Sequence, residues 1–347
     1  MDTDDAFFVT PQTRQPLIRR GRYLVTRDDH ARYPIILQTP ILLPSSDASV
    51  WHRELVEMIL WEHPDAIEAI YTDVTQWRKD PNALYVQTIR DVVGGKPEIL
   101  RAAERYATAD TGKWLPKKSA NQTISHFAKK DFLKYGTASN GKRRTETVMT
   151  SNHKDAYTGY RAMIAACAPH QILELSTGAG TGTANAACVM PMDAKLYTVD
   201  IDFSCLGNAA GIARYHDKAV LPVCANFWYL PFADASFDLV CTLNGLDESR
   251  EIQRTLAEAA RVLRPGGRFL VLSRKSAYMR QNRILANFGF NAAETEELLQ
   301  TCRMYASAED LIERCREYHL QLTETSAFSS DETLIWVISL FQKSIQM

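Results

Sequence analysis

The chain lacks the features that define several large classes of protein. Its 347 residues include seven cysteines, none in a CxxC pair and most within apolar or helical patterns, so we expect reduced core thiols rather than disulfides or a zinc site. No uncharged apolar run reaches the about 18 residues of a membrane span. The first residues, MDTDDAFFVTPQ, show no basic segment followed by an apolar one. These absences predict a cytoplasmic protein without a membrane span.

A sizeable net charge is also missing. The 40 Lys and Arg residues nearly balance the 41 Asp and Glu residues, which leaves a formal charge of −1. Such a chain has no overall field for gripping nucleic acid or an anionic membrane, so a small-molecule substrate is the expected partner. The sequence does not fix the oligomeric state, and a homodimer stays open.

Three segments precede the most regular part of the chain. In residues 1–48, short strand-like runs are limited by prolines, which predicts a small β module. Residues 49–135 carry apolar residues at helical spacing and are expected to form a helical cap or substrate region. Residues 136–156 are polar and rich in Gly, Ser, Thr and Asn, which predicts a flexible loop or a lid over an active site.

Strand and helix patterns alternate regularly in residues 157–347. Repeated βα units imply parallel strands joined by right-handed crossovers, and the last two strand-like runs suggest an antiparallel edge. The predicted fold is therefore α/β: a Rossmann-like, seven-stranded, mostly parallel sheet with helices on both faces, to which the β module and the helical cap are added.

The most informative segment is ILELSTGAGTGT, at residues 172–183, where an apolar strand passes through a Gly-rich turn into a helix. Gly178 and Gly180 let the backbone approach a ligand where a Cβ would collide. Asp200 ends the next strand, 20 residues after Gly180, where a carboxylate reaches ribose hydroxyls in this topology. Thr183 stands where dinucleotide sites carry a third Gly or Ala, which argues against NAD or FAD.

Four segments follow one another in a specific order: ELSTGAGTG, TVDID, LPFADASFDLV and RVLRPGGRFLVLS. Together they resemble the class I, Rossmann-like S-adenosylmethionine-dependent methyltransferases over about residues 157–275, in particular the branch with the ubiquinone and menaquinone methyltransferases. The resemblance implies S-adenosylmethionine as cofactor, with Glu174 against its methionine part, Asp200 on its ribose and Asn226 at the adenine position. The residues expected to bind it are Glu174, Ser176, Gly178, Gly180, Asp200, Ile201, Asn226, Phe227, Asn244, Tyr157 and Tyr160.

Two of these positions depart from the family pattern. Ser176 replaces a common first glycine and is tolerated there if its φ is negative. Asn226 replaces an adenine-recognising Asp, and its carbonyl oxygen still accepts a hydrogen bond from the adenine amino group. Tyr157 and Tyr160 lie one turn apart on the preceding helix, where lining of the cofactor pocket and core packing are both open.

The β module carries a second resemblance. FFVTPQTRQPL and YLVTRDDHARYPIILQTPILLP are similar to the zinc-ribbon activator proteins of tRNA and protein methyltransferases. The zinc ligands of that family fall at Thr10, Thr13, Thr26 and Asp29, none of which is Cys. Closed zinc sites need thiolate or imidazole, so no metal is expected, and we interpret the module as a β unit that contacts the catalytic domain.

Few residues need take part chemically. Methyl transfer from a sulfonium is an in-line displacement, so alignment and the exclusion of water are the main tasks. A base within hydrogen-bond reach helps where the acceptor is a hydroxyl or a protonated amine. The candidate catalytic residues are His153, before the Rossmann-like fold, and Asp247 or Glu248, after its fourth strand. The two acids are also explained as the start of a helix, where negative charge is favoured.

Three functions remain open. The leading hypothesis is a small-molecule methyltransferase. A nucleic-acid or protein methyltransferase is favoured by the activator-like module and by a basic stripe, although overall neutrality argues against phosphate contacts. A scaffold or regulatory protein that binds S-adenosylmethionine without methylating is the third, because a fold alone does not fix chemistry. The stripe, which solvated surface charge also explains, comprises Lys117, Lys118, Lys129, Lys130, Lys142, Arg143 and Arg144.

Overall fold

The fold is described from a computed structural model. The structure describes residues 7–43, 133–249, 251–274, 291, 293, 305, 307–331 and 334–345. The predicted helical cap, apart from its last three residues, lies outside this set. Helix α13 spans Ala308–Glu317.

Seven strands of one sheet form the centre of the molecule. In space they run β7-β6-β5-β8-β9-β11-β10. Neighbouring strands are parallel from β7 to β9, and β11 is antiparallel to both β9 and β10. This arrangement confirms the predicted Rossmann-like fold with an antiparallel edge. The bounds are β5 Gln171–Leu175, β6 Lys195–Asp200, β7 Ala219–Ala225, β8 Phe237–Leu243, β9 Leu263–Arg274, β10 Leu320–Asp331 and β11 Leu334–Lys343.

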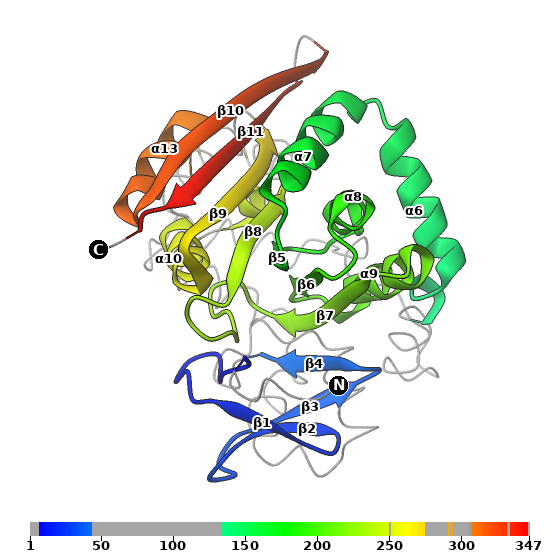
Figure 1. Ribbon diagram of the computed structural model, residues 1–347, viewed down its shortest axis with the longest axis vertical. Helices are drawn as coiled ribbons and strands as arrows, with labels where there is room; N and C mark the ends of the chain where they lie inside the picture. The colour runs from blue at the N-terminus through cyan, green and yellow to red at the C-terminus, as the bar shows by residue number, and fades with distance from the viewer. Residues whose placement is uncertain are drawn as a thin grey trace.

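Helices cover both faces of this sheet (Figure 1). Helices α6, α7, α8 and α9 precede or connect β5, β6 and β7. Helices η3, α10 and α13 come after β8 in the chain. The bounds are α6 Ala138–Thr150, α7 Lys154–Cys167, α8 Thr181–Val189, α9 Phe203–His216, the 3-10 helix η3 Gly245–Glu248, α10 Ile252–Val262 and α13.

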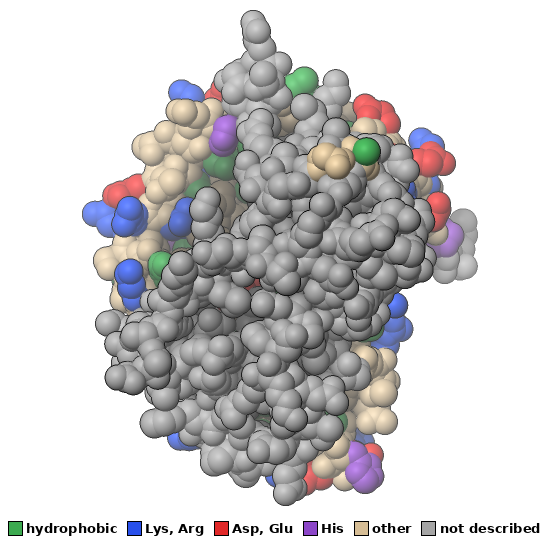
Figure 2. All heavy atoms as spheres, turned by 180° about the vertical axis from the view of Figure 1, so that it is seen from behind, with side chains coloured by type: hydrophobic (Ala, Val, Ile, Leu, Met, Phe, Trp, Pro, Cys, Tyr) green, Lys and Arg blue, Asp and Glu red, His purple; other side chains and the backbone are tan. Residues whose placement is uncertain are grey.

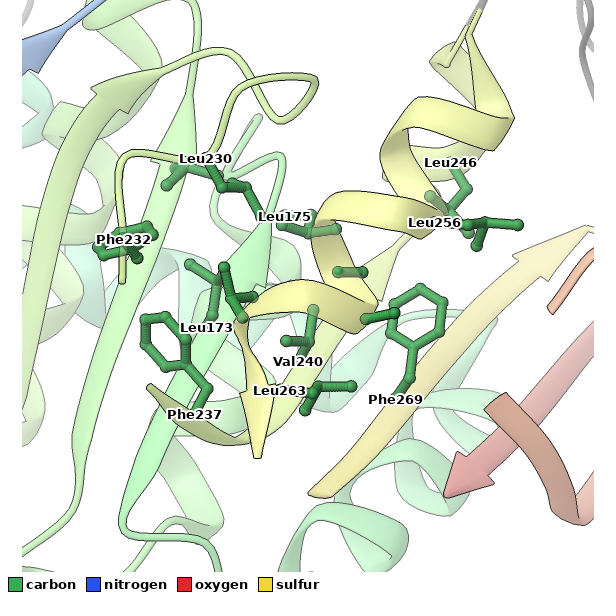
Figure 3. Close-up of a cluster of buried hydrophobic side chains, with 14 of the residues drawn as sticks. Leu173, Leu175, Leu230, Phe232, Phe237, Val240, Leu246, Leu256, Leu263 and Phe269 are labelled. Carbon is green, nitrogen blue, oxygen red and sulfur yellow. The ribbon is translucent and has the colours of Figure 1, made fainter. Parts of the chain in front are cut away.

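Alternate side chains of each strand point to opposite faces, as strand geometry requires. Ile172 of β5 and Leu196 of β6 pack with residues of α6, α7, α8 and α9, and we call this side the α8 face. Leu173 and Tyr197, one position further along each strand, pack with residues of α10 and α13 on the α10 face. Figure 3 shows the core of the α10 face, where Phe237 and other large side chains surround Leu173.

The N-terminal module is an antiparallel meander whose strands continue the same sheet. The bounds are β1 Leu17–Arg20, β2 Tyr23–Thr26, β3 Arg32–Ile36 and β4 Thr39–Leu42. β4 pairs in parallel with β7, with Ile41 opposite Cys224 and Leu42 opposite Ala225. The sheet therefore has 11 strands among the described residues, in place of the separate seven-stranded sheet that the sequence predicts.

Aromatic side chains make a second contact between the module and the domain. Phe8 forms an isolated antiparallel bridge with Phe232. The Phe7 ring lies 5.5 Å from the ring of Phe237 and 4.7 Å from that of Tyr197, measured between centroids. Module and domain thus share one core on the α10 face, as the sequence interpretation expects of a β unit that contacts the domain.

Three of the four residues that the sequence analysis compares with zinc ligands make hydrogen bonds within their turns. The hydroxyl oxygens of Thr10 and Thr13 are hydrogen-bonded at 2.6 Å, and Thr10 Oγ1 also accepts from the backbone N–H of Gln15 at 2.9 Å. Thr26 Oγ1 accepts from the backbone N–H of Ala31. Local polar contacts therefore hold these turns.

The segment predicted as a flexible loop, residues 136–156, is mostly helical: it contains α6 and the start of α7. Thr137 caps α6 by accepting from the backbone N–H of Asn140. The buried positions of α6 are Gly141, Thr145 and Val148, which share one face at helical spacing. The prediction of a loop was wrong because this face has a single large apolar residue, and a pattern of apolar residues therefore does not reveal the helix.

No helix among the described residues is long and apolar enough to cross a membrane. Six of the seven cysteines fall in this part of the chain, and all six are free thiols.

Candidate cofactor site

The Gly-rich turn between β5 and α8 has the backbone that the sequence predicts. Gly178 and Gly180 have φ angles of 47° and 82°, in the left-handed region that glycine adopts without strain. A Cβ on Gly178 would meet no atom within 4 Å, so this glycine faces open space. On the other side, Gly180 is close to the α9 side chains of Ile212 and Asn208. The turn is therefore supported from behind and open in front.

Glu174 lies beneath this turn and is buried, with 1% of its surface exposed. Its Oε2 accepts hydrogen bonds from the hydroxyls of Thr183, at 2.5 Å, and Thr198, at 2.7 Å. Its Oε1 lies at the start of α8, where a Cβ on Gly182 would collide with it. Burial raises the pKa of this carboxyl group to about 7, against the two hydroxyl contacts, which lower it.

Asp200 ends β6 beside the same turn. Its Oδ2 accepts from the backbone N–H of Gly178 at 2.7 Å, and its Oδ1 accepts from that of Asp202 at 2.9 Å. A carboxylate oxygen accepts more than one hydrogen bond, so both contacts are compatible with further donors such as ribose hydroxyls. The structure thus brings the predicted ribose acid next to the predicted turn.

Asn226 and Phe227 follow β7 directly, at the same end of the sheet. Asn226 is 5% exposed, and its Oδ1 accepts from the backbone N–H of Trp228 at 2.9 Å. That oxygen, expected to meet the adenine amino group, therefore also holds the local turn. Ile201 is placed just after β6, and its carbonyl oxygen accepts a contact from the Cys224 thiol at 3.6 Å.

Ser176 and Asn244 are brought together by a close approach of two chain segments. A Cβ on Gly245, the residue after Asn244, would lie 2.8 Å from both the Ser176 Cβ and the Leu175 carbonyl oxygen. From the sequence, a serine at position 176 is accepted on the condition that its φ is negative. Its φ is 67°, so this condition is not met, and a serine stands where glycine is favoured. Asn244 also has a positive φ, of 62°, which Asn adopts more readily than most residues.

Tyr157 and Tyr160 lie on α7 over the α8 face, and both are buried. Tyr160 is fully buried beside Cys241 and Glu174, and burial raises the pKa of its phenol well above the usual value. Tyr157 packs near His153, which precedes α7, with ring centroids 6.2 Å apart. The His153 ring lies 5.0 Å from that of Trp336 on β11. Since Trp336 pairs with Arg274 at the end of β9, this group lies at the carboxyl edge of the sheet.

Asp247 and Glu248 belong to η3, directly after β8. Asp247 is fully buried, and its Oδ1 accepts a hydrogen bond from the Tyr305 hydroxyl. This contact favours a structural role for the carboxylate. Asp238, at the start of β8, accepts from the backbone N–H groups of His170 and Gln171, which gives it a structural role as well.

Sequence reasoning missed three residues that surround the turn. Thr183 and Thr198 hold Glu174, and Asn208 donates from Nδ2 to the carbonyl oxygen of Gly178 at 3.2 Å. Arg144, interpreted as part of a surface stripe, is half-buried beside Gly180. Arg144 precedes the buried Thr145 on α6, so its place near the turn can be inferred from the sequence only once the segment is known to be a helix.

The strand order and the Gly-rich turn flanked by two acids define the class to which the fold belongs: residues 173–271 have the Rossmann-like fold that class I S-adenosylmethionine-dependent methyltransferases share. These residues match a family described as a methyltransferase domain. The chain is 35% identical over 106 residues to the ubiquinone/menaquinone biosynthesis C-methyltransferase of Nitrobacter hamburgensis, a match that covers 30% of this chain and 42% of that protein.

Two further proteins are similar. A demethylmenaquinone methyltransferase of Beutenbergia cavernae is 39% identical over 101 residues, which cover 29% of this chain and 39% of that protein. The solved structure of the N-methyltransferase NodS from Bradyrhizobium japonicum shares 16% identity and a TM-score of 0.43, over 56% of this chain and 98% of that one. The chain spans about 40% of the length of the two curated relatives.

The residues present fit the cofactor of this class. Gly178 leaves space in front of the turn, and Asp200 and Asn226 stand at the ends of the two neighbouring strands. Asn244 Oδ1 is buried and has no hydrogen-bond partner among the described residues. An unsatisfied buried acceptor at the carboxyl edge of a parallel sheet is suited to a ligand that brings donors.

Proposed function

We propose that the protein is an S-adenosylmethionine-dependent methyltransferase that acts on a small-molecule acceptor. The observation that carries the proposal is the juxtaposition, at one end of the sheet, of the open Gly178 turn and the carboxylate of Asp200. Glu174 and Asn244 add an acid and an amide around the same turn. S-adenosylmethionine supplies an activated methyl group on a sulfonium when it is bound.

The chain itself has the tasks of binding, orientation and the exclusion of water. Asp200 and Asn226 hold the nucleoside part, and the turn from Ser176 to Gly180 lies along the rest of the cofactor. His153 is the proposed base, because its ring stands at the carboxyl edge beside Trp336. Its proposed role is to accept a proton from an acceptor that carries one. The Asp247 carboxylate, by contrast, is buried and bonded to the Tyr305 hydroxyl.

Two observations support a small acceptor. The relatives described above are named for methylation in ubiquinone and menaquinone biosynthesis. Lys and Arg side chains are intermixed with Asp and Glu side chains around the margin of the face in Figure 2, where the described residues are visible. A nucleic-acid substrate calls for a basic surface instead.

Calorimetric titration with S-adenosylhomocysteine tests the cofactor site. Replacing Asp200 with Ala removes an acceptor that is charged and nine-tenths buried, so we expect roughly 10- to 100-fold weaker binding. Asp193→Ala is the matched control, because Asp193 is exposed and lies outside the turn. Absence of saturable binding to the unsubstituted protein at millimolar ligand would overturn the proposed function.

The class of acceptor is tested with cofactor labelled in its methyl group. The protein is incubated separately with a metabolite extract, with total RNA and with denatured protein. Label in the organic-extractable fraction supports the proposal, and label in acid-precipitable RNA or protein contradicts it. Binding without transfer to any of the three would instead favour a scaffold or regulatory protein.

A further inference from the structure

Helix α6 is fixed tightly to the methyltransferase domain. Gly141 of α6 and Gly211 of α9 face each other so closely that a Cβ on Gly141 would collide with the Gly211 carbonyl oxygen. Thr145 Oγ1 is hydrogen-bonded to His216 Nε2 at 2.9 Å, four residues further along α6 and five further along α9. The position of α6 is therefore set by a backbone contact and a polar contact, which together define its height and rotation on α9.

A chain of amides connects α6 to the cofactor turn. Asn140 donates from Nδ2 to the Oδ1 of Asn208 at 3.1 Å, and Asn208 donates from its own Nδ2 to the carbonyl oxygen of Gly178 at 3.2 Å. Side chains that follow Asn140 by one turn on α6 consequently lie next to the turn. The residue at that spacing is Arg144, whose Cγ is 3.8 Å from the place that a Cβ on Gly180 would occupy.

The surroundings of Arg144 leave its charge uncompensated. Among the residues that the structure describes, no carboxylate forms an ion pair with it, whereas its neighbour Lys142 pairs with Glu146. Arg144 is half-buried, and the loss of water and the charge of Arg143 lower the pKa of its guanidinium. Removing a guanidinium from water without an anion costs free energy, which binding of an anionic ligand would recover.

We propose that Arg144 binds the carboxylate of the amino-acid part of S-adenosylmethionine. This inference rests on the proposed function, since it names a contact to the same cofactor. The planar guanidinium can form two parallel hydrogen bonds with a carboxylate, which a lysine ammonium cannot. Helix α6 thereby becomes part of the cofactor site, and Arg144 selects ligands that carry a carboxylate beside the Gly-rich turn.

The test compares two ligands that differ only in this carboxylate. S-adenosylhomocysteine and its decarboxylated analogue, S-adenosyl-3-thiopropylamine, are titrated into the full chain and into Arg144→Gln. We expect the substitution to weaken S-adenosylhomocysteine binding roughly 10- to 100-fold, as loss of a charged hydrogen-bonding partner does, and to change binding of the analogue less than about twofold. Arg143→Gln, an exposed change on the same helix, should alter neither. Arg144→Lys should recover part of the loss.

Each other outcome overturns the inference. Equal weakening of both ligands would mean that Arg144 supports the turn and does not contact the carboxylate. Unchanged binding of both would mean that the guanidinium serves another anion. Circular-dichroism melting of Arg144→Gln separates these cases from misfolding. Failure of the unsubstituted chain to bind either ligand would instead remove the proposed function itself.

Discussion

The two faces of the central sheet are packed by different kinds of residue. On the α10 face, large aromatic and branched side chains fill the space between strands and helices, among them Phe232, Phe237, Phe269 and Phe341. The α8 face also holds large side chains such as Tyr160 and Trp336, but alanines and polar groups lie among them at comparable depths. The buried small or polar residues there include Glu174, Thr183, Ala184, Asn185, Ala186, Ala187, Thr198 and Ala209.

This difference separates stability from ligand binding. Large apolar side chains contribute more favourable burial free energy per residue than small ones. A face of small residues lets helices and turns approach the strands closely, and its polar groups must be hydrogen-bonded to one another at that depth. The cofactor turn lies on the second kind of face, where Thr183 and Thr198 supply the hydrogen bonds that keep Glu174 in place.

Phe237→Ala is the largest expected effect, and it tests the α10 face. Phe237 is fully buried, and its ring lies 5.0 Å from that of Phe232. Removing it should lower the free energy of unfolding by about 3–5 kcal/mol, because a cavity is left in a well-packed core. Urea denaturation measures the change. Phe237→Leu is the control and should cost less, and an equal loss in both variants would show that the cavity is not the cause.

Glu174→Gln tests the α8 face through its pH dependence. A carboxyl with a pKa of about 7 when folded, against an ordinary value of 4.5, is protonated more in the folded state than in the unfolded one. The free energy of unfolding should therefore fall as pH rises from about 4.5 to 7, by on the order of 3 kcal/mol. The amide does not titrate, so the variant should lack this fall and be more stable than the parent at pH 8.

The measurement for Glu174 is the difference in unfolding free energy between variant and parent, taken without ligand at several pH values. A difference that grows between pH 4.5 and 7 and is then constant supports the assignment. A difference that stays the same across this range would show that Glu174 is ionised in the folded protein.

Ser176→Gly should have the smallest effect, a stabilisation where Phe237→Ala destabilises. Serine at a φ of 67° is strained, and glycine removes that strain. We expect a gain in unfolding free energy of about 1 kcal/mol in the protein without ligand. Ala179→Gly, in the same turn at a residue without positive φ, should instead lose about 0.5–1 kcal/mol. Thermal melting measures both changes. Equal effects of the two substitutions on the melting temperature would show that the backbone of Ser176 is not strained.

The sequence predicts the sheet and the turn well, for a physical reason. Buried parallel strands are continuous apolar runs, and the break in such a run at Gly178 and Gly180 marks a ligand-binding turn. Asp200 is predictable because an acidic residue that ends an apolar run marks the place where a buried strand reaches the edge of the sheet. These features depend on residues that are close together in sequence.

The rest depends on contacts between distant segments. Helix α6 is held by glycine backbone and by amides, and neither leaves an apolar period in the sequence. Arg144 and Asn208 acquire meaning only when α6 and α9 are in contact. The close approach of Gly245 to Ser176 is likewise a contact between residues that are distant along the chain.

The pairing of β4 with β7 has a consequence for the behaviour of the protein at high concentration. β7 is an apolar strand, and unpaired backbone groups along such an edge form a template for association with other chains. With β4 in place, the outermost strand on that side among the described residues is β1, which has only four residues and ends in the exposed Arg19 and Arg20. A short edge with positive charge is a poor template, so the module protects the domain from edge-to-edge aggregation.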